Sequence, residues 1–411
     1  MELQILNSYL TPDSTGLFST NQYSTIDSKP LWYNFIVRHL GEIDVDINIL
    51  PYEDLNKNKP WILDVAVQGW TWYDFKGDII AVFNDSIRDD LLNGSAYLLL
   101  NHEWESHTYK FLISLYEKLK DSPIDPKKII YMCHGADLES LHNEVIKECN
   151  IPIGRRITTI FSPHLACVFH QTKTKLDFFN RNDITVVNKP KKYLFLNRQP
   201  HIHRIEMTSL LSHYDLLEQG YVSLGHPRDA WIDPEALNKD PRMVDGFSKI
   251  KDNLPLLIDT TELKSDLSMY NSLSMDYYVN SYFSLVSATI ALDTQDRSRS
   301  VTEKEFKTML AQHPFLLLGR PYTLRHLKDM GFMTFDKWFD EAYDEEPDLL
   351  TRMTMLAMEV KRLVNTPNAK WEKMLSEMIP ILRHNYNRVA NYSSERCYFT
   401  GDLKKLLYYV A

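Results

Sequence analysis

Polar and basic side chains follow one of the predicted strands of this chain. The strand is expected at 193–196, and Asn197, Arg198, His203 and Arg204 come after it. Arg198, His203 and Arg204 could together hold a diphosphate, the arginines through paired hydrogen bonds. A helix predicted to begin nearby would add a potential that favours an anion. The alternative is an ordinary surface loop between a strand and a helix.

A second group of candidates stands at the start of a helix predicted at 303–312. Thr302 and Glu305 have the spacing of a capping box, which would explain both residues without a ligand. The cap does not require Glu303 or Lys304. A carboxylate at Glu303 could accept hydrogen bonds from ribose hydroxyls, and Lys304 could meet a phosphate at the helix N-terminus. Spacing alone leaves the capping and the binding roles of this segment open.

Candidate acid–base residues follow two strands nearer the N-terminus. Glu103 and Glu105 come after the predicted strand at 97–100, and Asp137 comes after the one at 129–133. A carboxylate in such a place could deprotonate an acceptor hydroxyl. The alternative is a solvated loop in which Asp137 caps a helix. None of these candidate groups contains an Asp-x-Asp motif, so the sequence predicts neither a metal site nor a bound cofactor.

The elements that position these residues form two α/β series. In the first, apolar runs predict strands at 61–67, 79–83, 97–100 and 129–133, with a helix at 108–119. In the second, strands are predicted at 193–196, 221–224, 254–258, 281–288 and 315–318. Alternation of strands and helices favours parallel sheets with right-handed crossovers.

The predicted architecture is therefore α/β, with two Rossmann-like domains facing a central cleft. The first domain covers 1–170, a polar linker covers 171–192, and the second domain covers 193–347. The helices at 348–411 have an apolar face, and we expect them to pack back on the first domain. In such sheets ligands bind outside the carboxyl ends of the strands.

Bulk composition narrows the class of protein. The chain has 411 residues and a net charge of -9, which disfavours a general nucleic-acid binder, although 151–210 holds ten Lys or Arg and three Asp or Glu. The four cysteines show no CxxC spacing, which favours a reducing compartment. No signal peptide or membrane-spanning run is visible, so we expect a cytoplasmic protein without membrane insertion, in the host cytoplasm if it is viral.

Several motifs of the second series carry a resemblance to a known family. They are Asn197-Arg198 with His203-Arg204, then Thr302-Glu303-Lys304, then the apolar strand 315–318 closed by Gly319, and the acidic segment 338–344. Together they resemble the donor half of GT-B-type glycosyltransferases. The likeness is to a viral group that includes phage DNA hydroxymethylcytosine glycosyltransferases such as arabinosyltransferases, and more distantly to fucosyltransferases. It covers roughly 190–350.

The resemblance implies a nucleotide-diphosphate sugar as donor, bound by Arg198, Arg204, Glu303 and Lys304. It thereby makes 193–347 the donor-side domain and 1–170 the acceptor-side domain. It also implies that protein cations, rather than a metal ion, neutralise the leaving diphosphate. A non-catalytic nucleotide- or glycan-binding relative is an alternative, disfavoured by the candidate bases in the first domain. A sugar-phosphate epimerase is disfavoured because neither domain carries G-x-G-x-x-G.

The acceptor has two alternatives. One is 5-hydroxymethylcytosine in double-stranded phage DNA, and the other is a protein or cell-surface glycan. A duplex would need a cationic rim to hold its phosphates. The residues that could supply it are Arg155, Arg156, Lys173, Lys175, Arg181, Lys189, Lys191 and Lys192. The overall acidity of the chain favours a glycan, whereas the resemblance to viral sequences and the basic stretch 151–210 favour DNA, so the acceptor we expect is 5-hydroxymethylcytosine in phage DNA.

Overall fold

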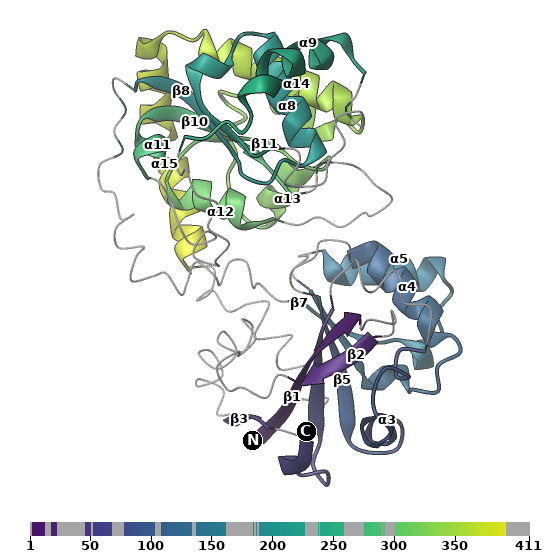
Figure 1. Cartoon of the computed structure of the whole chain (residues 1–411). Helices are drawn as coiled ribbons and strands as arrows, with labels where there is room; N and C mark the ends of the chain where they lie inside the picture. Colours follow the sequence, from purple (N-terminus) through teal and green to yellow (C-terminus); the bar gives the residue numbers. More distant parts are fainter. Residues whose placement is uncertain are drawn as a thin grey trace. The chain divides into compact units, whose positions relative to one another are not determined.

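The chain divides into two compact α/β units in the computed structural model (Figure 1). The first unit comprises Met1–Cys167, Thr294–Ser300 and Glu395–Ala411, and the second comprises Val168–Asp293 and Val301–Ser394. The structure describes residues 2–12, 18–22, 46–50, 52–67, 78–102, 108–133, 137–161, 184, 186, 189–226, 237, 239–258, 275–289, 291 and 301–391.

The first unit is built on a sheet in the order β2-β1-β4-β5-β6-β7, with β3 also paired to β1. Its strands are β1 (Glu2–Pro12), β2 (Phe18–Gln22), β3 (Asp46–Ile49), β4 (Trp61–Ala66), β5 (Ala96–His102), β6 (Ile129–Cys133) and β7 (Thr158–Phe161). Within these strands only the β1–β2 pair is antiparallel. The sequence predicted β4, β5 and β6, and it missed the three strands before residue 60.

Three helices cover one face of this sheet and close its core. They are α3 (Asp85–Leu92), α4 (Thr108–Leu119) and α5 (Leu138–Glu148). Their apolar stripes, with Leu91, Phe111 and Leu141 among them, join strand residues such as Leu63 and Leu98 in one buried cluster. Short 3-10 turns at Tyr52–Asp54, Pro126–Lys128 and Ile153–Arg155 connect the elements.

The strand predicted at 79–83 does not form. The main-chain N–H of Ile80 donates to the Asp78 carboxylate, and Ala81 N–H donates to the Asp78 carbonyl. These bonds turn the backbone, while Ile79, Ile80 and Phe83 remain buried in the core. The apolar run 79–83 indicates that the segment is buried, but it does not determine whether the segment is a strand. Here the hydrogen bonds to Asp78 favour a turn.

The second unit contains a parallel sheet in the order β11-β10-β8-β9. Its strands are β8 (Lys191–Asn197), β9 (Gly220–Leu224), β10 (Ser281–Ser287) and β11 (Phe315–Leu318). The helices are α8 (Ile202–His213), α9 (Pro241–Ile250), α11 (Met275–Val279), α12 (Glu303–Leu310), α13 (Thr323–Asp329), α14 (Leu349–Val364) and α15 (Asn368–Asn391). Short 3-10 turns lie at Leu217–Gln219, Lys251–Asn253 and Ala342–Glu345.

Strand order places a topological switch point between β8 and β10. From β8 the chain passes through α8 to β9 on one side, and β10 and β11 lie on the other side. Figure 1 shows α8, α9 and α14 on one face of the sheet and α12 and α13 on the other. Ligands of open parallel sheets bind at such a point, outside the carboxyl ends of the strands. The expected α/β class with Rossmann-like sheets is confirmed in both units. The predicted strand at 254–258 is reduced to an isolated bridge between Leu224 and Leu256.

The C-terminal helices find a partner for their apolar faces within the second unit. Trp371 of α15 is fully buried and stacks on Tyr282 and Phe283 of β10, with ring centroids 5.3 and 5.4 Å apart. Its indole N–H donates to Leu363 O of α14 at 2.9 Å. The expected return of 348–411 to the first domain stays a prediction. Among the described helices, none is long and apolar enough to cross a membrane.

Candidate functional site

The carboxyl ends of β8 and β10 flank the switch point and end in two polar residues. Ser284 of β10 pairs with Leu194 of β8, and the same register, continued to the strand ends, brings Ser287 beside Asn197. Side chains alternate along a strand, so Asn197 shares a face with Tyr193. The Tyr193 hydroxyl donates to Leu216 O just after α8. Asn197 and Ser287 therefore lie on the face that α8 covers.

The side chains of Asn197 and Ser287 are buried without a hydrogen-bond partner among the residues that the structure describes. Asn197 is 1% exposed, and both its amide oxygen and its amide nitrogen lack a partner; the Ser287 hydroxyl, in a residue 3% exposed, also lacks one. The main chain of Asn197 is satisfied, because its N–H donates to Ser223 Oγ and its carbonyl accepts from Gly225. A buried polar group left unpaired costs about 1–3 kcal/mol. Such a cost at a switch point indicates a ligand site.

Arg204, which the sequence predicted as a ligand contact, ties α8 to the end of β10. The residue is 2% exposed. Its guanidinium donates to Gln199 O at 2.8 Å, to Ala288 O at 3.2 Å and to Ser287 O at 3.4 Å. These bonds fix a positive charge at the carboxyl edge. A direct contact of Arg204 with a ligand stays a prediction, and its role in positioning this edge follows from the three bonds.

Two histidines beside Arg204 are held in the neutral form. Burial, with Arg204 and Lys304 nearby, lowers the pKa of His201 to about 4. Burial and Arg204 lower the pKa of His203 to about 3. The two rings are nearly parallel with centroids 5.8 Å apart, and His203 Nε2 donates to Ala288 O at 3.0 Å. His203 is therefore used by the fold, as Arg204 is, while the imidazole of His201 stays partly exposed.

The start of α12 brings Lys304 to the same edge. Thr302 caps the helix, and the Glu305 carboxylate accepts from the Thr302 N–H and hydroxyl at 2.8 and 2.7 Å. The capping box predicted from the sequence is confirmed. It engages Thr302 and leaves the half-buried Lys304 ammonium directed to Thr289 Oγ1, 3.2 Å away, just after β10. Glu303 begins the helix, and its side chain lies outside the described residues.

Arg198 is half-buried directly after β8. A Cβ added at Gly225 would lie 2.0 Å from the Arg198 carbonyl, so only glycine allows this approach of the chain after β9. This packing sets the main chain between Asn197 and α8. Asn197, Arg198, Arg204 and Lys304 thus lie at one edge of one sheet, and their joint use as a ligand site stays a prediction.

The sequence did not point to two further arginines near this edge. Arg320 is buried just after β11, where the same rule of polar residues after a strand could have found it. Arg352 lies within α14 and is fully buried, donating to Ala291 O at 2.6 Å and to Pro347 O at 3.1 Å. Arg352 thereby fixes the chain that follows β10. In the sequence it looks like any exposed helical arginine.

The candidate bases of the first unit are only partly described. Glu103 and Glu105 lie outside the described residues. Asp137 occupies the N-cap position of α5 without a side-chain capping bond, so the capping role proposed as its alternative is not seen. His102, at the end of β5, is fully buried and its Nδ1 lies 2.8 Å from the Tyr131 hydroxyl. A catalytic base among the carboxylates stays a prediction.

Of the residues proposed as a cationic rim, Lys173, Lys175 and Arg181 lie outside the described residues, Arg155 and Arg156 belong to the first unit, and the remaining three lysines bind main-chain carbonyls of the second unit. Lys189 donates to Val279 O at 2.5 Å, and Lys191 donates to Glu218 O at 2.6 Å. Lys192 donates to Thr366 O at 2.8 Å and to Asn368 Oδ1 at 2.6 Å. All three stand at the amino end of β8, opposite the end that carries Asn197. Their ammonium groups serve the fold of the second unit.

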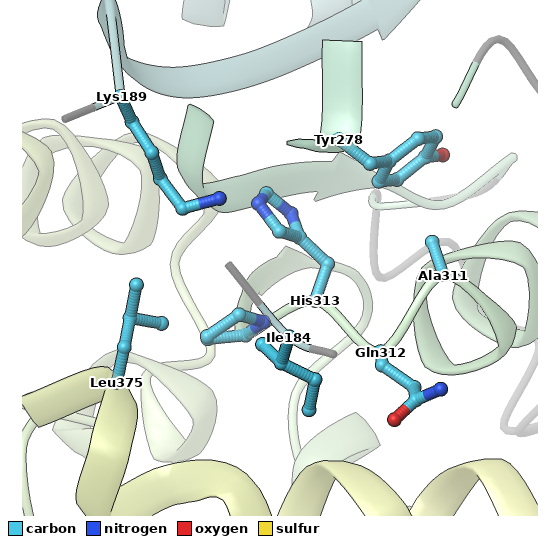
Figure 2. Close-up of a pocket in the computed structure, with 8 residues that line it drawn as sticks. Ile184, Lys189, Tyr278, Ala311, Gln312, His313 and Leu375 are labelled. Atoms are coloured by element: carbon cyan, nitrogen blue, oxygen red, sulfur yellow. The ribbon is translucent and has the colours of Figure 1, made fainter. Parts of the chain in front are cut away.

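A small cavity lies at this amino edge, lined in part by Lys189, Tyr278 and His313 (Figure 2). Its volume of ≈ 20 Å³ suits about one water molecule and excludes a nucleotide. His313 Nε2 donates to Ser281 O and its Nδ1 accepts from Ser284 Oγ, both at 2.8 Å. Burial and Lys189 lower the pKa of His313 to about 3. This histidine is a satisfied core residue.

Comparisons with known proteins reveal only distant likeness, and only to solved structures. No protein-family model matches the chain, and no curated protein matches it. A crystal structure of α,α-trehalose-6-phosphate synthase from Burkholderia multivorans is similar at 12% identity and a TM-score of 0.43, over 92% of this chain and 74% of that chain. A likeness this weak carries no argument about the reaction. In the described part of the chain, no three His, Cys, Asp or Glu side chains are grouped to hold a metal ion.

Proposed function

We propose that this protein is a glycosyltransferase that binds a nucleotide-diphosphate sugar at the carboxyl edge of the β8–β10 sheet. The observation that carries the proposal is the buried Asn197 and Ser287 pair, whose side chains have no partner in the described structure. Arg204 donates to Ser287 O, and Lys304 reaches Thr289, two residues further on. The pair offers hydrogen bonds, and the cations offer charge, at a switch point where parallel sheets bind nucleotides. The motif resemblance to GT-B-type glycosyltransferases supports the same assignment.

The edge has the chemistry that a departing diphosphate requires. In the transfer, the bond from the sugar anomeric carbon to the diphosphate oxygen breaks, and a bond from that carbon to the acceptor oxygen forms. Negative charge then grows on the diphosphate. Lys304 and the fixed charge of Arg204 would stabilise it, and the neutral His201 ring could donate a hydrogen bond. The acceptor proton would pass to Glu103, Glu105 or Asp137.

The acceptor keeps its two predicted alternatives, 5-hydroxymethylcytosine in DNA and a glycan. Lys189, Lys191 and Lys192 keep their charge, but their carbonyl bonds hold them at the amino end of β8, away from the proposed donor site at the carboxyl edge. Sugar transfer to duplex DNA with and without hydroxymethylcytosine, run beside simple glycan acceptors, separates the alternatives. A non-catalytic relative would bind the donor and transfer sugar to neither.

The test of the function is thermal stabilisation by a panel of nucleotide sugars, followed by assay of sugar release. We expect at least one member to raise the Tm, since a ligand that binds only the folded state stabilises it. The same nucleotide sugar should then be cleaved to the nucleotide diphosphate. Stabilisation by none of the panel would refute the proposal.

A further inference from the structure

The unpartnered groups of Asn197 specify what kind of ligand group would satisfy them. A carboxamide carries an oxygen that accepts and an NH₂ that donates. Both atoms lack a partner among the described residues, and the Ser287 hydroxyl on the next strand is in the same situation. A matching ligand group must therefore both donate and accept at this position.

We infer that Asn197 and Ser287 bind a pair of neighbouring hydroxyl groups of the nucleotide sugar, and this inference rests on the proposed function. Phosphate oxygens only accept, so a phosphate would satisfy the amide nitrogen and leave the amide oxygen unpaired. In a vicinal diol, one hydroxyl can donate to the amide oxygen while the other accepts from the amide nitrogen. Ser287 can complete either bond.

The surroundings place the diphosphate next to this diol site. Arg204 binds the carbonyls of Ser287 and Ala288, and Lys304 contacts Thr289 just beyond. The cations thus continue from the polar pair along the end of β10. A sugar ring on the polar pair and a diphosphate on the cations fit one ligand. Asn197 is 1% exposed, so entry of the ligand includes a local rearrangement at this edge.

The chain provides a matched control in Asn385 of α15. Asn385 is also 1% exposed, yet its amide donates to Met333 O at 2.7 Å and accepts from Met333 N–H at 2.8 Å. The two asparagines are alike in burial and differ in whether their amides are satisfied. Replacing each with leucine, which has a similar size and no polar atoms, separates an amide that serves folding from one that serves binding.

The first measurement is the Tm of the free protein. Asn197→Leu should hold or raise the Tm, by up to about 2–4 °C, because it removes an unpaired buried amide. Asn385→Leu should lower the Tm, because it leaves the Met333 carbonyl and N–H unpaired. A fall with Asn197→Leu as large as that with Asn385→Leu would overturn the inference. Asn197→Ala, which adds no bulk, repeats the binding test below if the leucine variant does not fold.

The second measurement is calorimetric binding of UDP-glucose, GDP-mannose, UDP and GDP. Asn197→Leu should weaken binding of the nucleotide sugar by about tenfold or more, and Asn385→Leu should not. If Asn197→Leu weakens binding of the nucleotide sugar and leaves binding of the nucleoside diphosphate unchanged, the diol belongs to the transferred sugar. The 2′-deoxy form of the nucleoside diphosphate is measured as a further ligand. If Asn197→Leu weakens binding of the nucleoside diphosphate equally and leaves binding of the 2′-deoxy form unchanged, the diol belongs to the ribose.

Two outcomes would contradict the inference, and they are distinguishable. If the wild-type protein binds a nucleotide sugar and Asn197→Leu binds it equally, the diol site is wrong and the proposed function stands. If the wild-type protein binds none of these four compounds and is stabilised by no member of the wider nucleotide-sugar panel, the proposed function fails and the diol site fails with it.

Discussion

The two edges of the second unit's sheet both carry basic side chains that donate to main-chain carbonyls, and they differ in the neutral polar groups beside those side chains. At the amino edge, Lys191 and Lys192 donate to main-chain carbonyls and His313 uses both ring nitrogens. At the carboxyl edge, Asn197 and Ser287 are buried without a partner in the described structure. Basic composition alone therefore does not locate a site. Polar groups that the fold leaves unsatisfied, next to fixed cations, are the more discriminating sign.

Removal of Arg204 should have the largest effect on stability. Arg204→Ala leaves the carbonyls of Gln199, Ser287 and Ala288 without their donor, so we expect a loss of about 3 kcal/mol or more in the free energy of unfolding. Lys191→Ala, at the exposed amino edge, should cost less than about 1 kcal/mol. Urea unfolding measures both. Equal losses would mean that Arg204 is not a structural part of the carboxyl edge.

Acid should destabilise both edges through neutral histidines, His201 and His203 at the carboxyl edge and His313 at the amino edge. The pKa of His203 and that of His313 are about 3 in the folded protein, below the ordinary value of 6.5. The unfolded chain therefore binds protons that the folded chain does not, and this stability is present above pH 6.5 and lost as the pH falls. Together the two should cost about 2.5 kcal/mol between pH 7 and 5.5.

Variants sharpen the comparison between the two histidines. His203→Gln and His313→Gln should each remove about 1.3 kcal/mol of this pH dependence, because the two pKa values are alike. Unfolding by urea at a series of pH values provides the measurement. A stability that stays flat from pH 7 to 5.5 in the wild type would contradict neutral burial of these rings.

The charge of Lys304 should affect donor binding and leave folding nearly unchanged. Loss of one charge-assisted contact costs about 1.5–3 kcal/mol, so Lys304→Ala should weaken nucleotide-sugar binding by tenfold or more. Lys191→Ala, at the amino edge, is the matched control, and its affinity for the nucleotide sugar should equal that of the wild type. Equal weakening in both variants would indicate a general charge effect rather than a site at the carboxyl edge.

The apolar periodicity of the sequence predicted most of the strands and long helices of the second unit, but it predicted little about the roles of individual side chains. The helix at Leu349–Val364 and the strand at Phe315–Leu318 match the sequence prediction because their apolar spacing reflects burial. Asn197 was placed correctly at a strand end. Arg204 is buried because it donates to carbonyls at the end of β10, more than eighty residues later in the chain. A local sequence pattern cannot predict such a contact. The roles of Lys192 and Arg352 depend on tertiary contacts in the same way.

Hydrogen exchange with and without a nucleotide sugar tests the central claim most directly, because it reads both edges of the sheet in one experiment. The account predicts protection of amides at 197–204, 287–289 and 302–304 when the nucleotide sugar binds. At the amino edge, residues 189–193 and 311–314, it predicts no added amide protection beyond the uniform increase that global stabilisation causes. Protection centred on the amino edge, with 197–204 unchanged, would contradict the assignment of the carboxyl edge as the donor site.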